Sequence, residues 1–235
     1  MANKPRVKAP KQRTSQRRAE DEAKKRRLYL LGGGSLVALL AIVGVVFALG
    51  VAGGGEAGAD EAIASLEEAG CTVTVKKAVA NISNHTDFPD PEATDPRWNT
   101  DPPTSGPHFG QTIAYGSYTD PIDIGRVLHN LEHGAVYVLY GSGVPAATVT
   151  QLQEFYRDHQ NGTVLAPYAR LKNQIALGAW VVPGLPQATN DRGSGVLAKC
   201  GTFDATAFDA FFDAFQFKGP ESPLLRPTDM QPGDF

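Results

Sequence analysis

Cysteine and methionine are scarce in this sequence, which has two of each among 235 residues. The two cysteines do not form a CxxC pair, which excludes a redox motif of the thioredoxin type. A P-loop and a dinucleotide-binding glycine fingerprint are also missing, and these absences exclude the two commonest phosphate-binding loops. The five histidines are therefore the main candidates for chemistry.

Basic residues are scarce after residue 27, so charge is divided unevenly along the chain. Residues 1–27 contain 11 Lys and Arg and three acidic residues, a net charge of +8. The rest of the chain has 11 basic and 22 acidic residues, a net charge of −11. Residues 28–52 carry no charge and are mostly apolar. Because about 20 apolar residues in a helix cross a bilayer core of about 30 Å, this run predicts a transmembrane helix.

The charges at its two ends predict the orientation of this span. Four basic residues, Lys24–Arg27, precede it, whereas Glu56 and Asp60 are the first charges after it. Since basic residues stay on the cytoplasmic side, we expect a single-pass protein of the cell membrane, with the lipid bilayer as its partner. The expected parts are a basic cytoplasmic tail (1–27), a transmembrane helix (28–52), a linker (53–59) and an extracytoplasmic globular domain (60–235).

Two other interpretations of the N-terminal region are less favoured. A cleaved signal peptide would use the small residues 57–59 as its cleavage site, but its apolar region is typically about 7–15 residues, shorter than this run. A nucleic-acid-binding arm would also be basic, yet membrane topology and contact with anionic lipid explain the charge more simply. No nucleic-acid partner is expected.

Both cysteines, Cys71 and Cys200, lie in the predicted extracytoplasmic domain. An oxidising compartment favours a disulfide between them, although two buried free thiols remain the alternative. The bridge would close a loop of roughly 130 residues and would contribute about 4–5 kcal/mol in the chain-entropy model.

Hydrophobic periodicity and capping residues predict an α+β fold with a small mixed sheet and two or three helices. The expected helices are 60–69, 145–159 and 204–217, and the expected strands are 71–79, 135–140 and 175–182. Residues 81–107 form a long, proline-rich loop, and the proline-containing tail 219–235 is expected to wrap the surface. Asp204 is expected to cap the last helix. Within it, Phe208, Phe211, Phe212 and Phe215 follow the spacing of a buried helical stripe, so they predict core packing.

Three of the five histidines, His108, His129 and His133, fall within 26 residues. His129 and His133 are four residues apart, so in a helix they share a face with a rise of about 6 Å, which suits one metal ion. In a strand they would lie about 13 Å apart, too far for one ion. The metal hypothesis therefore requires a helical turn that Gly134 ends.

Glu132 and Met230 are possible fourth ligands. A lone methionine in a polar, proline-rich tail is not expected to fill the core. Imidazole together with a thioether suits copper, whereas imidazole alone suits zinc as well as copper. His85 is a weaker additional candidate, and His159 is explained by its place at a helix C-terminus. The alternative for each histidine is a hydrogen-bonded structural role.

The segment from His129 to His133 also fits the H-x-x-E-H pattern of zinc peptidases, in which the glutamate is the base. That helix would have to continue past the second histidine, but Gly134 and the strand-forming residues 136–138 oppose this. The pattern also needs a third carboxylate ligand, and no feature of the sequence supports Glu154 or Glu221 in that role. Ser105 lacks the setting of a nucleophile and is expected to stabilise a turn.

The motifs PPTSGPH (102–108), YGSY (115–118) and HNLEHG (129–134), the last followed by VYVLY, resemble the domain-of-unknown-function 3105 family. The resemblance covers roughly residues 70–220. It implies a single-span bacterial membrane protein, typically actinobacterial, with His108 and residues 129–134 in the shared core. It implies no ligand or activity.

The favoured hypothesis is a membrane-anchored extracytoplasmic domain that binds copper or zinc through His108, His129 and His133, in envelope metal handling rather than catalysis. The first alternative is a non-enzymatic structural or interaction module of the envelope, in which the His and Glu residues only brace a buried polar turn and an envelope protein is a possible partner (the structural-module hypothesis). A zinc-dependent hydrolase that uses the HxxEH motif is the second.

Overall fold

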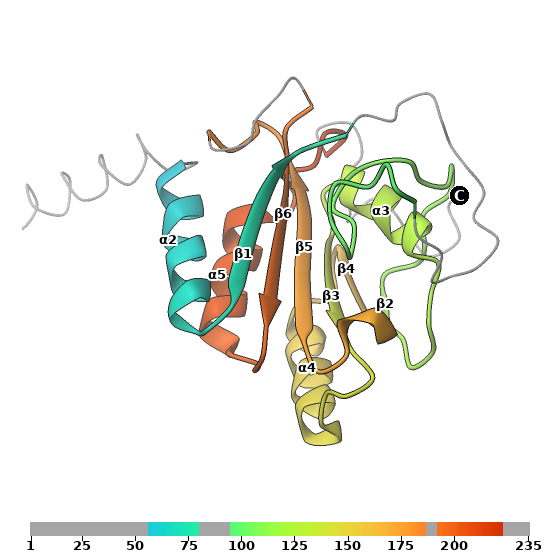
Figure 1. Ribbon diagram of the computed structural model, residues 1–235, viewed down its shortest axis with the longest axis vertical. Helices are drawn as coiled ribbons and strands as arrows, with labels where there is room; N and C mark the ends of the chain where they lie inside the picture. The colour runs from blue at the N-terminus through green and yellow to red at the C-terminus, as the bar shows by residue number, and fades with distance from the viewer. Residues whose placement is uncertain (1–55, 80–94, 187–191, 223–235) are drawn as a thin grey trace, which may run out of the picture. The chain divides into compact units, whose positions relative to one another are not determined.

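A six-stranded mixed sheet forms the centre of the computed structural model, which describes residues 56–79, 95–186 and 192–222 (Figure 1). The strands lie in the order β1-β6-β5-β3-β4-β2. β4 is parallel to its neighbours β3 and β2, and the other pairs are antiparallel. The strands are β1 (Thr72–Lys77), β2 (Gly116–Ser117), β3 (Val136–Tyr140), β4 (Thr163–Pro167), β5 (Ile175–Val181) and β6 (Ser194–Cys200).

Helices cover both faces of this sheet (Figure 1). Those in the described ranges are α2 (Glu56–Glu68), α3 (Ile124–Glu132), α4 (Ala146–Asp158) and α5 (Ala205–Phe215), with a 3₁₀ turn at Ala169–Leu171. The four phenylalanines of α5 are buried with residues of α2 and α4 against one face, and α3 packs on the other. Because β3 and β5 are covered on both sides, their sequences are almost continuously apolar.

The Asp204 side chain accepts a hydrogen bond from the Ala207 N–H at the start of α5. This contact satisfies one of the free N–H groups at the helix N-terminus. The cap and the phenylalanine stripe that the sequence predicted for this helix are both present in the structure.

The disulfide between Cys71 and Cys200 is confirmed, and no cysteine is left free. It joins the start of β1 to the end of β6, next to the antiparallel pair Thr72 and Lys199. Residues 129 positions apart in the chain are thus held together at one edge of the sheet.

The α+β class and the mixed sheet are confirmed, but the domain has more elements than expected. Four helices, rather than two or three, occur in the described residues, and the sheet gains β2, β4 and β6. Helix α2 begins at Glu56, four residues before the predicted start, so residues 56–59 of the expected linker are helical. Helix α3 begins at Ile124, five residues before the expected turn at His129, and its N-cap residue Asp123 makes no side-chain capping hydrogen bond.

None of the helices in residues 56–79, 95–186 and 192–222 has the length and apolar character needed to span a bilayer. The predicted basic tail and transmembrane helix, residues 1–52, lie outside the described residues.

Candidate metal centre

His108 stands at the end of a loop that its own side chains hold together. The Asn99 side-chain oxygen accepts hydrogen bonds from the backbone N–H groups of Thr104 and Ser105, and the Trp98 indole donates to the Pro107 carbonyl. Ser105 is fully buried, and its hydroxyl oxygen accepts a hydrogen bond from the Val79 N–H. Ser105 therefore stabilises the loop, as predicted.

Helix α3 supplies the other side chains. It buries Val127, Leu128 and Leu131 against the sheet and ends at Glu132, with His133 as its C-cap residue. Gly134 follows with φ +88° and donates to the Leu131 carbonyl, so the helix stops before β3. The helical turn that the metal hypothesis required is present.

Asn130, on the same helix, ties the loop after His108 to α3. Its side chain accepts from the Ile113 N–H and donates to the Ile113 carbonyl. The loop is thereby held on both sides of His108, by Asn99 before it and by Asn130 after it.

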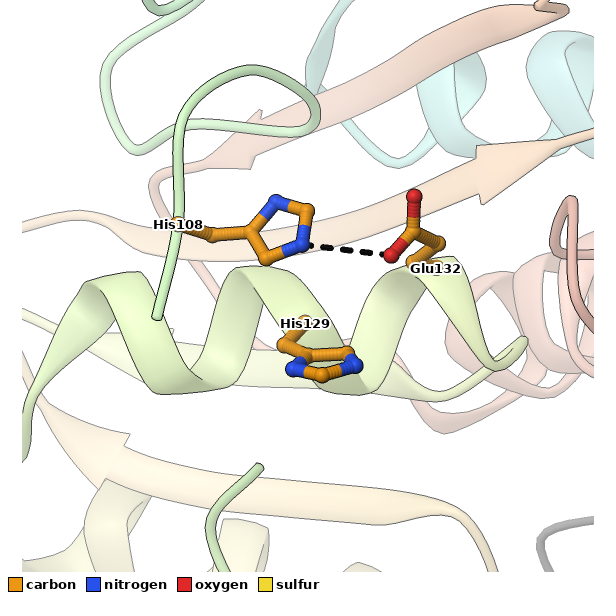
Figure 2. A group of neighbouring side chains, drawn as sticks. All are labelled: His108, His129 and Glu132. Carbon is orange, nitrogen blue, oxygen red and sulfur yellow. Dashed lines mark ion pairs between the residues drawn. The ribbon is translucent and has the colours of Figure 1, made fainter. Parts of the chain in front are cut away.

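Figure 2 shows His108 reaching across to Glu132, with His129 one turn earlier on the same helix. The His108 Nε2 lies 3.1 Å from the Glu132 Oε2, and one ligand atom from each of His108, His129 and Glu132 falls within 4.8 Å of the others. The His129 Nε2 lies 3.0 Å from the His133 Nε2. Ligands around a tetrahedral zinc ion are about 3.4 Å apart. The contacts at 3.1 and 3.0 Å are close to that spacing, whereas the group of three, at up to 4.8 Å, would have to tighten around an ion.

The Nδ1 atoms of two histidines contact backbone carbonyls. The His108 Nδ1 lies 2.8 Å from the Gly106 carbonyl oxygen, and the His129 Nδ1 lies 2.9 Å from that of Phe109. A carbonyl only accepts, so Nδ1 donates in both, and Nε2 is the ring nitrogen that each histidine turns toward the site. The His108 Nε2 faces a Glu132 oxygen, and the His129 Nε2 faces the His133 ring. Two groups that can both accept need a cation between them, so each of these contacts is a place for a proton or a metal ion.

The site is enclosed, and its pKa values reflect this. His108, Glu132 and His133 are buried, and His129 is half-buried. Burial, followed by the nearby His108 and His133, lowers the pKa of His129 to about 4. Burial also lowers the pKa of His133. Burial opposes ionisation of Glu132, but the hydrogen bond with His108 and the surrounding imidazoles outweigh it, and the Glu132 pKa is lowered. At neutral pH the site therefore has neutral His129 and His133 beside an ionised carboxylate.

In the absence of metal, acid is expected to destabilise the domain between pH 6.5 and about pH 4. Within this range His129 is protonated in the unfolded chain but not in the fold, so the unfolded state binds more protons. The contribution of His129 to the free energy of unfolding is fully present above pH 6.5. It is lost as the pH falls to about 4, and the loss is roughly 2–4 kcal/mol. The lowered pKa of Glu132 acts in the same direction at lower pH.

Urea unfolding with a chelator, followed by circular dichroism at pH 7, 5 and 4, measures this loss. His129→Gln removes the titrating ring and should flatten the dependence. An equal fall in both proteins would show that His129 is not its source.

The predicted ligands are brought together only in part. His108, His129 and Glu132 converge, and His133 joins through His129. Met230 and His85 lie outside the described residues. Glu154 pairs with Arg157 on the surface, and His159 pairs with Asp209, so neither belongs to the site. These positions are those the sequence predicted for ligands, and metal binding itself stays a prediction.

Other members of the site were missed. The backbone carbonyls of Gly106 and Phe109 carry no signal in the sequence, because every residue has a backbone carbonyl. Glu221 was considered only as an unsupported third ligand of a peptidase site, and its contact with His133, 3.5 Å from Oε2 to Nδ1, was not predicted. Asn130 was visible inside the HNLEH motif, but its role depends on a loop 17 residues away.

Comparison with known proteins assigns a family. Residues 91–226 match the family described as "Protein of unknown function (DUF3105)". The chain belongs to this family. The DUF3105 match contains the whole described site, from the His108 loop through α3 to Glu221. No curated protein and no solved structure matches the chain.

Proposed function

We propose that this DUF3105 domain binds one zinc or copper ion through the Nε2 atoms of His108 and His129 and the carboxylate of Glu132. The observation that carries the proposal is the pairing of each Nδ1 with a backbone carbonyl, while each Nε2 contacts Glu132 or His133 and the three residues lie close together. Histidines that bind metal almost always donate their second ring N–H to a carbonyl or carboxylate, because this contact orients the ring and selects its tautomer.

A shared proton is the competing explanation for the same geometry. One proton between His108 and Glu132 would make an ion pair, and a His133 N–H could donate to His129. That arrangement would brace a buried turn and would need no metal, as in the structural-module hypothesis. The metal explanation accounts for both contacts with one cation and matches the spacing expected around it.

The ligand set favours zinc or Cu(II). Imidazole and carboxylate donors suit both ions, whereas a Cu(I) site would draw on a soft sulfur ligand such as that of Met230. A zinc hydrolase is less well supported. The contact of Glu132 with His108 at the end of the helix favours a ligand role over that of a base held away from the ion.

The place of this function is proposed to be the outer side of the cell membrane, in envelope metal handling. The Cys71–Cys200 disulfide supports export, because such bonds persist in oxidising compartments. The uncharged run 28–52 after a basic tail supports a single-pass anchor with the domain outside.

Metal analysis of the full chain, purified in detergent without chelator, tests the proposal. We expect one zinc or copper ion per chain, and His108→Ala and His129→Ala should each weaken binding by about 100-fold or more, because each removes a ligand that contacts the ion directly.

His159→Ala is the matched control, since His159 contacts Asp209 on the far face and should leave affinity unchanged. A wild-type chain that binds neither ion after exposure to a slight excess would refute the metal centre. The structural-module hypothesis would then replace it.

A further inference from the structure

The segment Phe217–Ser222, here called the C-terminal strap, crosses the end of the metal-site helix. The Phe217 N–H donates to the Gly134 carbonyl and the Glu221 N–H to the Glu132 carbonyl, at 2.7 and 2.9 Å. The Ser222 hydroxyl donates to the His133 carbonyl at 3.1 Å. The carbonyls at the end of a helix have no partners within it, so the strap satisfies three consecutive groups that would otherwise be left open.

The strap also places a carboxylate behind His133. The Glu221 Oε2 lies 3.5 Å from the His133 Nδ1, which is buried and makes no hydrogen bond to the described residues. The opposite ring nitrogen, Nε2, lies 3.0 Å from the His129 Nε2. His133 is therefore situated between the proposed metal position and Glu221, with one nitrogen toward each.

The tautomer of His133 explains the long contact. His129 donates from Nδ1 to Phe109, so its Nε2 accepts, and a neutral His133 must donate to it from Nε2. The His133 Nδ1 then carries a lone pair, which repels the Glu221 carboxylate. A metal ion bound at Nε2 would require the other tautomer, in which Nδ1 carries the proton and donates to Glu221. The ring keeps one proton, which is lost at Nε2 and regained at Nδ1 through solvent.

We propose that His133 is the fourth ligand of the metal and that Glu221 is the positioning residue that orients it. This inference rests on the proposed function. Through Glu221 the strap closes the site, giving a carboxylate–histidine–metal arrangement and four protein ligands. Sites with four protein ligands leave no position for a substrate, and this is consistent with holding an ion rather than catalysis.

Closure by the strap has a thermodynamic consequence. If the strap improves metal binding by a given factor, then metal binding must favour the docked strap by the same factor. The C-terminal segment and the ion thus stabilise each other, and the strap is the part of the site whose displacement would release the ion.

Zinc affinity of the full chain in detergent, measured by competition with a chromophoric chelator, tests Glu221. Glu221→Ala should weaken binding by about 10–100-fold, the usual effect of removing such a partner. Glu221→Gln should lose less, because its amide oxygen still accepts from Nδ1. Glu154→Gln removes a carboxylate that pairs with Arg157 at the surface and is the matched control, with no expected change.

A spectroscopic measurement separates positioning from general stability. Co(II) in the wild-type site should give the intense visible bands of a four-coordinate ion, and Glu221→Ala should weaken them as water replaces His133, while far-ultraviolet circular dichroism stays unchanged. Unchanged affinity and Co(II) bands in Glu221→Ala, with wild-type binding intact, would overturn this inference alone. A wild-type chain without metal affinity would overturn both proposals.

Discussion

Replacement of Cys71 and Cys200 together by alanine is expected to lower the free energy of unfolding by about 5 kcal/mol. The bridge joins residues 129 positions apart, and in the chain-entropy model a loop of this length restricts the unfolded chain by about that amount. Both cysteines are buried beside the pair of β1 and β6, and alanine is smaller, so the fold should accept it without steric conflict. Since the free energy of unfolding of a domain is typically about 5–15 kcal/mol, this loss can leave the domain only marginally stable.

Urea unfolding of the oxidised, reduced and double-alanine proteins measures this effect. The reduced wild type should resemble the variant, whose own midpoint should be insensitive to reductant. The bridge lies at the sheet edge beside α2 and α5, whereas His129 and His133 belong to α3, which packs on the other face. The folded variant should therefore keep its metal affinity. Equal midpoints for oxidised and reduced wild type would contradict the prediction.

The elements that were predicted correctly are those whose sequence signals lie within the element itself. The α5 stripe repeats at helical spacing and begins after a capping aspartate, so it needs no knowledge of the rest of the chain. The turn at His129 and His133 was predicted because Gly134 and the β-branched residues after it limit where a helix can end. The disulfide was predicted because only two cysteines are present and one compartment would oxidise them.

The missed features depend on contacts between distant segments. Strand β6 becomes a strand through pairing with β1 and β5, and its residues, SGVLAKC, show little alternation because both faces are covered. Glu221, which contacts His133 in the structure, lies 88 residues after it in the chain. No sequence pattern links the two positions, because the path of the backbone after α5 brings them together.

The site combines three segments, of which the strap lies far from the other two in the sequence. The loop before His108 is held by Asn99, the helix ends at Glu132, and the strap closes over that end. Three imidazoles within 26 residues are unusual, so the histidines were visible in the sequence. The ring nitrogen that each histidine turns to the centre depends on the carbonyls of Gly106 and Phe109, and therefore on the path of the whole loop.

Gly134→Ala is expected to destabilise the domain by about 2–4 kcal/mol and to weaken zinc binding with it. Gly134 has φ +88°, where a side chain is strained by about 1 kcal/mol. Its added Cβ would also overlap the Ser222 hydroxyl and lie 2.9 Å from the Phe217 Cα. Such overpacking typically costs a further 1–3 kcal/mol, and relief requires that the strap move away from the helix end.

Gly70→Ala is the matched control for this prediction. Gly70 ends α2 with φ +81°, but nothing lies within 4 Å of a Cβ added there. It therefore carries the same backbone strain without the steric conflict, and the difference between the two variants in urea unfolding isolates the contact with the strap. Because Gly70 lies away from the histidines, its variant should bind zinc as the wild type does. Gly134→Ala should lose affinity beyond its loss of stability, since displacement of the strap moves Glu221 away from His133. If both variants were equally stable and bound zinc equally well, the strap would have no part in holding the site closed.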